Sequence, residues 1–375
     1  MRIGILTYHS SHNYGAFLQA YALSHVIEDE TGNQTELIDF TMKKAAKVNR
    51  DNRWFNKRHV KSVIYNFNRY KMFETSRKVY QKLSCDSLIS DDLEEFANWL
   101  NGKKYDVIVV GSDEIWKLDG YRGFPNPYWL PGITNCKKMA YAASSRTELE
   151  KITPENKQKI GKLLQSFSYI GVRDAVTEKL IEDVSDRNQA CHLNCDPTMA
   201  YDFKTTKQES REFVAARFGN KGKKKKIALM IGVPELAYNI IKRFGNEYDF
   251  ISLYDYYGST KGFIPLDPFE WMKTISGVDG LITTFYHGMI FAIKNDTPFL
   301  MIENREMKEK EYSKSYDLLN RYSECGRRFA FVTDENIMDR VHELLMESEK
   351  GDVDFSSIRE AEKRRFQSFI MALNE

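Results

Sequence analysis

The residues best placed for chemistry lie in one stretch, residues 279–302, which reads DGLITTFYHGMIFAIKNDTPFLMI. The apolar run 280–284 predicts a buried strand, and the apolar run 289–294 predicts a short helix. The turn between them carries His287. It lies where a strand ends and a helix starts, which is where ligands bind in open α/β sheets and where backbone N–H groups favour an anion. We expect His287 either to bind a ligand there or to cap its own helix.

Two further strand ends carry polar side chains. The apolar run DVIVVG, residues 106–111, is followed by Ser112, Asp113 and Glu114. These side chains could bind a polyhydroxylated substrate with one carboxylate as general base, or an acid could simply cap the following turn. The run YIGVR, residues 169–173, ends in Arg173, whose guanidinium is suited to a carboxylate or phosphate. The alternative for Arg173 is an ion pair with Asp174 or another neighbour.

The elements that position these side chains alternate between strands and helices in both halves of the chain. The pattern predicts an α/β fold of two domains. We place the first domain at 1–205, with a basic helical insertion at about 41–100, and the second at 206–350. An amphipathic helix in 351–375 could pack back on the first domain.

The first strand and helix do not form a dinucleotide-binding site. The turn after the first strand, HSSHNYG at 9–15, lacks the G-x-G-x-x-G fingerprint, so no nicotinamide or flavin site is predicted. Asp39 lies at the end of the predicted second strand, residues 35–40, at a position suited to a ribose-binding acid, but without that fingerprint a solvated strand end is the better interpretation.

Composition indicates a globular protein. Of 375 residues, 42% are hydrophobic and 29% are charged, and the net charge is +2. No apolar run reaches the roughly 18 residues of a membrane span, and the N-terminus lacks a signal-peptide pattern, so we expect a cytoplasmic protein. The five cysteines are scattered, and the Cys191–Cys195 segment has no second pair of ligands nearby. No disulfide framework and no required metal are predicted.

The charge is unevenly distributed. Between residues 43 and 82 thirteen basic residues face only Asp51 and Glu74, and aromatic residues recur among them at helical spacing. Nucleic-acid binding is one interpretation, but these aromatics more naturally bury one helix face. A surface for anionic lipid, or for an acceptor that carries pyrophosphate, is the other. We predict no nucleic-acid partner and a possible peripheral contact with the inner face of the membrane through 43–82.

Several segments together resemble the polysaccharide pyruvyl transferase family over nearly the whole chain. The matching pieces are ILTYHSSHNYGAFLQAYAL (5–23), VIVVGSDEIW (107–116), MAYAAS (139–144), IGVRDAVTEKL (170–180), CDPT (195–198), DPFEWM (267–272) and TTFYHGMIFAIKNDTPFL (283–300). The resemblance implies a GT-B-like fold, with two Rossmann-like domains facing across a cleft. It also implies transfer of a carboxyethylidene (pyruvyl) group from phosphoenolpyruvate, as co-substrate, to two hydroxyls of a sugar in a capsule or exopolysaccharide, with no cofactor.

The resemblance also assigns roles. It implies His287 and Asp113 as catalytic residues, the first as general acid and the second as the group that orients or deprotonates an acceptor hydroxyl. The expected donor-binding residues are Arg173, Tyr286, Gly288 and Arg146, and the expected acceptor-binding residues are Asn13, Tyr14, Gly15, Gln19, Ser112 and Trp116. Glycine at 288 would let a ligand approach the backbone closely.

Two positions depart from the family pattern. Phe285 stands where many relatives have Arg or Ser, and Arg146 stands where many have Gly. Arg146 could replace the charge missing at 285 or lie outside the site. A rival interpretation is a GT-B glycosyltransferase with a nucleotide-sugar donor, for which Glu303 or Glu306 could bind ribose. A protein that only binds its ligand is a third, because fold does not fix function.

Overall fold

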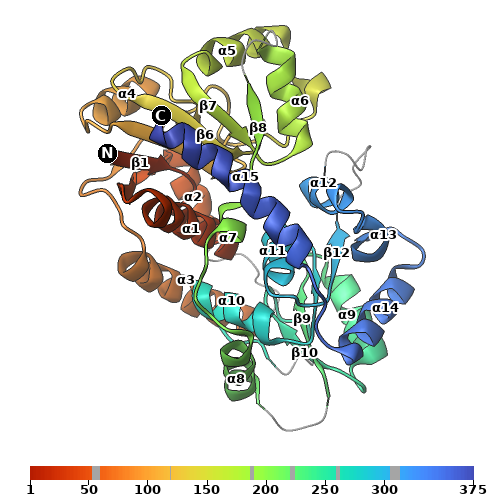
Figure 1. Ribbon diagram of the computed structural model, residues 1–375. Coiled ribbons are helices and arrows are strands. Elements are labelled where there is room, and N and C mark those ends of the chain that lie inside the picture. Colours follow the sequence, from red (N-terminus) through yellow and green to blue (C-terminus); the bar gives the residue numbers. More distant parts are fainter. Residues whose placement is uncertain (53–59, 119, 186–189, 220–223, 259–261, 305–312) are drawn as a thin grey trace. The chain divides into compact units, whose positions relative to one another are not determined.

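The structure is a computed structural model, and it describes residues 1–52, 60–118, 120–185, 190–219, 224–258, 262–304 and 313–375 (Figure 1). The chain forms two compact units. Unit 1 comprises Met1–Asn52, Arg77–Tyr201 and Ala361–Glu375, and unit 2 comprises Arg53–Ser76 and Asp202–Glu360. Each unit is built around its own parallel sheet, so the chain is α/β with two Rossmann-like domains.

The sheet of unit 1 has six parallel strands in the order β2-β1-β5-β6-β7-β8. Their bounds are β1 Arg2–Leu6, β2 Gln34–Leu37, β5 Val107–Asp113, β6 Lys137–Ala143, β7 Phe167–Val172 and β8 Cys191–Leu193. The central strands are apolar on both faces, as in a sheet covered by helices on each side. A small parallel pair, β3 (Phe40–Thr41) and β4 (Leu88–Ile89), lies outside this sheet.

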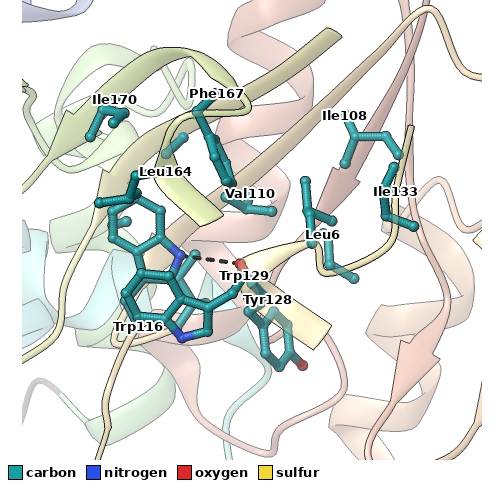
Figure 2. Close-up of a cluster of buried hydrophobic side chains, with 14 of the residues drawn as sticks. Leu6, Ile108, Val110, Trp116, Tyr128, Trp129, Ile133, Leu164, Phe167 and Ile170 are labelled. Atoms are coloured by element: carbon teal, nitrogen blue, oxygen red, sulfur yellow. Dashed lines mark hydrogen bonds between the residues drawn. The ribbon is translucent and has the colours of Figure 1, made fainter. Parts of the chain in front are cut away.

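Most helices of unit 1 start at a side-chain cap. The helices are α1 Tyr14–Thr31, α2 Lys43–Asn52, α4 Leu93–Asn101, α5 Pro154–Leu164, α6 Ala175–Val184 and α7 Pro197–Ala200. Asn13, Asp92, Thr153, Asp174 and Asp196 each accept a hydrogen bond from a backbone N–H of the first turn. Figure 2 shows part of the core of this unit, where Trp116 packs with Trp129, Leu164 and Phe167.

Unit 2 has a five-stranded parallel sheet in the order β10-β9-β11-β12-β13. The strands are β9 Lys226–Met230, β10 Asp249–Ser252, β11 Gly280–Thr283, β12 Phe299–Glu303 and β13 Phe329–Phe331. The helices are α8 Lys207–Phe218, α9 Pro234–Phe244, α10 Pro268–Gly277, α11 Tyr286–Lys294, α12 Lys314–Arg321, α13 Cys325–Arg328 and α14 Ile337–Lys350. Helix α3, Val60–Tyr80, belongs to unit 2 as far as Ser76.

The last helix, α15 (Ser356–Asn374), returns the chain to unit 1. Phe369 packs 4.7 Å from the ring of Tyr141 and 5.6 Å from that of Tyr169. The ammonium of Lys137 donates to the carbonyl of Ala372 at 2.8 Å. From Ala361 onward the helix is therefore part of the fold of the first unit.

The domain bounds differ from the predicted ones in two places. The first unit ends at Tyr201 instead of 205, and residues 53–76 belong to unit 2 instead of to an insertion in the first domain. The sequence did not predict that this segment belongs to unit 2, because helix α3 crosses the domain boundary after Ser76 without a break in its sequence pattern. Among the described residues, no helix is long and apolar enough to span a bilayer.

Candidate functional site

In each unit the strand order identifies the point where a ligand is expected. The chain leaves β1 for β2 on one side and later adds β5 on the other, so the order reverses between β1 and β5. In unit 2 the order reverses between β9 and β11 in the same way. Ligands of open parallel sheets bind at the carboxyl ends of the strands at such a reversal. Asp113 is the last residue of β5, and His287 lies in the first turn of α11, the helix that follows β11.

A buried polar network holds the reversal point of unit 1. The amide of Gln19 donates to Thr7 Oγ1 at 2.9 Å and accepts from Ser112 Oγ at 2.7 Å, and Thr7 donates to the carbonyl of Ser112 at 2.9 Å. All three side chains are fully buried. Gln19 and Ser112 therefore tie α1 to β1 and β5, which corrects the prediction that they contact an acceptor.

The other predicted acceptor residues have structural positions as well. Asn13 is exposed, and its side chain caps α1 by accepting from the N–H of Ala16 at 3.1 Å, whereas Tyr14 and Gly15 are buried in the first turn of that helix. Trp116 lies in the core. Its indole N–H donates to the carbonyl of Tyr128 at 3.1 Å (Figure 2), so it does not line a sugar site.

Arg173 is an internal cation of unit 1. Its guanidinium lies 3.0 Å from Asp196 and 3.6 Å from Asp113, and its side chain is 1% exposed. The structure therefore corrects the prediction of donor binding in favour of the ion pair. The partner is not Asp174, which caps α6 by accepting from the N–H of Thr177 at 2.9 Å. Arg173 positions Asp113, the last residue of β5.

Partly exposed polar groups do gather after β1 and β5. The hydroxyl of Tyr8 donates to the carbonyl of Glu114 at 2.9 Å, and the carboxylate of Glu114 lies 3.3 Å from Arg146. Arg122 lies 3.9 Å over the ring of Tyr8. Burial raises the pKa of Tyr8 well above its ordinary value, against the attraction of Arg122, so this hydroxyl stays protonated. Arg146 is thus part of the unit 1 edge.

Tyr8 and Arg122 were missed by sequence reasoning. Tyr8 lies two residues after the end of β1, which was a usable signal. Arg122 lies in an irregular segment between β5 and β6, where no periodicity or motif marks it.

A second charged cluster lies beside the same edge. His9 is buried, and its Nε2 lies 2.9 Å from Asp39, which also accepts from Arg77 at 2.8 Å. Burial alone would raise the pKa of Asp39, but the hydrogen bond and charge of His9, together with Arg77, outweigh it and lower that pKa. Asp39 is therefore held by two protein groups and is not a simple solvated strand end.

The turn after β11 is fixed by two hydroxyls. Thr283 Oγ1 accepts from the N–H of Phe285 at 3.0 Å, and Thr284 Oγ1 accepts from the N–H of Gly232 at 2.8 Å. The second bond joins the turns after β11 and β9 at the reversal point of unit 2. Helix α11 begins at Tyr286, three residues earlier than expected, so His287 lies within its first turn.

His287 is partly exposed at the positive end of the α11 dipole. Phe285, the residue that precedes the helix, has no side-chain acceptor and makes no capping bond. The side chain of Phe285 therefore does not compete with a bound anion for the backbone N–H groups at the start of α11. The predicted roles of His287 and Asp113 as catalytic groups stay predictions.

Gly288 has a packing role. A Cβ atom at this position would lie 2.6 Å from Thr283 Oγ1 and 3.3 Å from Met230 Sδ. The glycine lets α11 pack closely on β11 and β9, and its predicted role in donor binding stays a prediction. Tyr286 is buried, with the ammonium of Lys314 4.8 Å over its ring.

The structure describes one of the two residues predicted to bind ribose. Glu303 ends β12, is 5% exposed and accepts from the hydroxyl of Ser313 at 3.1 Å. It is therefore engaged at the cap of α12. Glu306 lies outside the described residues. Within the described part of the chain, no three His, Cys, Asp or Glu side chains form a group that could hold a metal ion.

The comparison with protein families decides the assignment. The family model described as polysaccharide pyruvyl transferase matches residues 13–306. The chain belongs to the polysaccharide pyruvyl transferase family. Proteins of this family are enzymes of polysaccharide biosynthesis, so this chain is assigned as an enzyme of that type. The match includes Asp113, Arg173 and His287.

Solved structures show the fold. A UDP-GlcNAc 2-epimerase from Neisseria meningitidis, bound to UDP-GlcNAc, is 10% identical, with a TM-score of 0.56 over 100% of this chain and 99% of that one. The enzyme from Methanocaldococcus jannaschii, in complex with UDP-GlcNAc and UDP, is 13% identical, with a TM-score of 0.54 over 98% and 100%. These likenesses identify a GT-B-like fold. A comparison with curated proteins found no significant match.

Proposed function

We propose that this enzyme transfers the pyruvyl group of phosphoenolpyruvate to two hydroxyls of a sugar in a bacterial cell-surface polysaccharide or its lipid-linked precursor. The products are a cyclic ketal and inorganic phosphate. The observation that carries the proposal is the family match over residues 13–306, which includes the turns at both reversal points.

The proposed reaction begins on the donor. A proton adds to the terminal methylene carbon of phosphoenolpyruvate, and positive charge develops on the carbon that bears the phosphate. One sugar hydroxyl adds to that carbon, phosphate leaves with its bonding electron pair, and the second hydroxyl closes the ring. Both hydroxyl protons pass to bases. The chemistry needs an acid, a base and a site for two anionic groups.

In unit 2, the proposed donor site is the turn after β11. The positive end of α11 favours the phosphate or carboxylate, and His287 in its first turn is the proposed general acid. Phe285 supplies neither charge nor hydroxyl, which leaves His287 and the helix end as the anion-binding elements of this turn.

In unit 1, the proposed acceptor side is the edge formed by Tyr8, Asp113, Glu114 and Arg122. Asp113 orients or deprotonates an acceptor hydroxyl, and Arg173, 3.6 Å away, holds Asp113 in place. Arg146, paired with Glu114, balances charge at this edge instead of binding the donor. Hydroxyl and carboxylate groups of this kind suit a polyhydroxylated acceptor.

The test is a transfer assay with phosphoenolpyruvate and candidate saccharides, in which phosphate release and ketal formation are both measured. We expect His287→Gln to lower the rate by at least about a hundredfold, the lower range for loss of a general acid. His342→Gln, at an exposed histidine of α14 in the same unit, is the matched control and should transfer normally. Normal transfer by His287→Gln would overturn the assignment of the acid.

A nucleotide-sugar glycosyltransferase is the alternative that the same experiment must separate. Glu303 is engaged by Ser313, which leaves it poorly disposed toward ribose hydroxyls. Release of a nucleoside diphosphate from a nucleotide sugar, with no phosphate released from phosphoenolpyruvate, would favour that alternative.

A further inference from the structure

Helix α3 exposes an apolar stripe that the fold does not use. Val60, Ile64 and Phe67 are 76%, 57% and 46% exposed. They are spaced four and three residues apart, so they lie on one face of the helix. Three large apolar side chains in a row on a solvent face point to a binding surface, because isolated exposed apolar residues are common and aligned ones are not.

The opposite face holds α3 on unit 2. The hydroxyl of Ser62 donates to Asp255 at 3.0 Å, and the ring of Tyr65 stacks on that of Phe263 with centroids 4.0 Å apart. Phe73 is buried on the same side. The helix is thus anchored without its exposed stripe, and the stripe is available to another surface.

Positive charge accompanies the stripe. Lys61 and Lys71 are exposed. The ammonium of Lys71 lies on the stripe, 4.5 Å over the ring of Phe67, and that of Lys61 lies beside it, 4.9 Å over the ring of Tyr256. The acidic residue of the helix, Glu74, is only partly exposed. Long lysine side chains can keep their charge at a polar surface while their methylene stems cover apolar neighbours.

We propose that the exposed face of α3, defined by Val60, Lys61, Ile64, Phe67 and Lys71, binds the surface of an anionic lipid bilayer. An amphipathic helix of this kind lies in the interface, with apolar side chains among the acyl chains and lysines at anionic headgroups. Free phosphate would satisfy the lysines but not the stripe.

Two other occupants fit less well. A second copy of the chain, paired symmetrically through this face, would bring like lysine charges together. A nucleic acid would need several aromatic platforms, but the proposed face offers only Phe67, because Tyr65 stacks on Phe263 and Phe73 is buried. The proposal does not depend on the pyruvyl donor. If the proposed function holds, membrane binding brings the enzyme to a lipid-linked acceptor.

The test is co-sedimentation of the full chain with vesicles of phosphatidylcholine alone or mixed with phosphatidylglycerol. We expect binding to the mixed vesicles, and weaker binding at high salt because exposed charges are screened. Ile64→Ser/Phe67→Ser should abolish it. Met346→Ser/Met371→Ser, which removes two exposed apolar side chains from α14 and α15, should leave it intact.

A charge-reversal pair tests the lysines. Each lysine near an anionic surface strengthens binding about fivefold, so Lys61→Glu/Lys71→Glu should weaken it at least about 25-fold. Lys242→Glu/Lys350→Glu makes the same change in net charge at exposed sites of α9 and α14. Equal loss in both pairs, no binding by the unaltered chain, or a change of oligomeric state in the Ile64/Phe67 variant would each overturn the proposal.

Discussion

At the scale of a residue, the position of Arg173 could be predicted from the sequence, but its interactions could not. Its place at the end of a strand is readable from YIGVR, but its partner is not. Asp196 is 23 residues away and meets Arg173 only because of the order of β7 and β8 in the sheet. Similarly, Trp116 follows β5 and Gln19 lies in the helix after β1, yet packing places both side chains in the interior.

Breaking the Arg173–Asp196 pair should be costly. Asp196→Asn leaves a buried guanidinium without its nearest charge partner, which costs about 3–5 kcal/mol of unfolding free energy. Urea denaturation, followed by tryptophan fluorescence, measures this. Asp339→Asn removes an exposed carboxylate 3.8 Å from Arg243 and should cost less than about 1 kcal/mol. A small effect at Asp196 would mean that Arg173 finds other partners or water.

Asp39 predicts a pH dependence. Its pKa is lower in the folded state than in the unfolded chain, so its ionised form stabilises the fold above about pH 4. That contribution is lost as the pH falls through the folded pKa. The difference in unfolding free energy between the unaltered chain and Asp39→Asn should therefore be largest near neutrality and shrink below about pH 4. A difference that is constant down to about pH 3 would contradict the ionic role.

At the scale of elements, the strand–turn–helix unit around His287 was predictable because its apolar runs are short and bounded by turn residues. The exact helix start was not. Phe285 offers no capping side chain, and the turn is set by Thr283 and Thr284, whose hydroxyls bond to backbone groups. The reason for Gly288 also depended on the fold, because only the fold shows how closely α11 lies on β11.

Gly288→Ala tests that packing. The added methyl group would overlap Thr283, so we expect a loss of about 1–3 kcal/mol in stability. Gly326→Ala, in α13, is the control, since no atom lies within 4 Å of the added Cβ. Thermal unfolding of both variants measures the difference. Unchanged stability of Gly288→Ala would instead favour the interpretation that glycine at this position lets a ligand approach the backbone.

At the scale of the whole molecule, alternation of strands and helices predicted two α/β domains, but not the exchange of segments between them. Residues 53–76 join unit 2, and residues from Ala361 onward join unit 1. Which unit such a segment packs against depends on which apolar faces remain uncovered once each sheet has formed. Local sequence patterns do not contain that information.

The return of α15 should be essential for unit 1. Phe369 is fully buried against Tyr141 and Tyr169, so Phe369→Ala should cost about 3–5 kcal/mol. Met371→Ala changes an exposed side chain of the same helix and should cost little. Hydrogen exchange would localise the loss of protection to unit 1 in the first variant; loss confined to the helix itself would argue against this role.

The most direct test of the proposed reaction is donor binding, because it needs no acceptor. A thermal-shift titration should show concentration-dependent stabilisation by phosphoenolpyruvate, reaching about 2.7 kcal/mol at a hundred times the dissociation constant. The shift should fall in His287→Gln and persist in His342→Gln. Stabilisation by UDP-sugars with none by phosphoenolpyruvate would contradict the account.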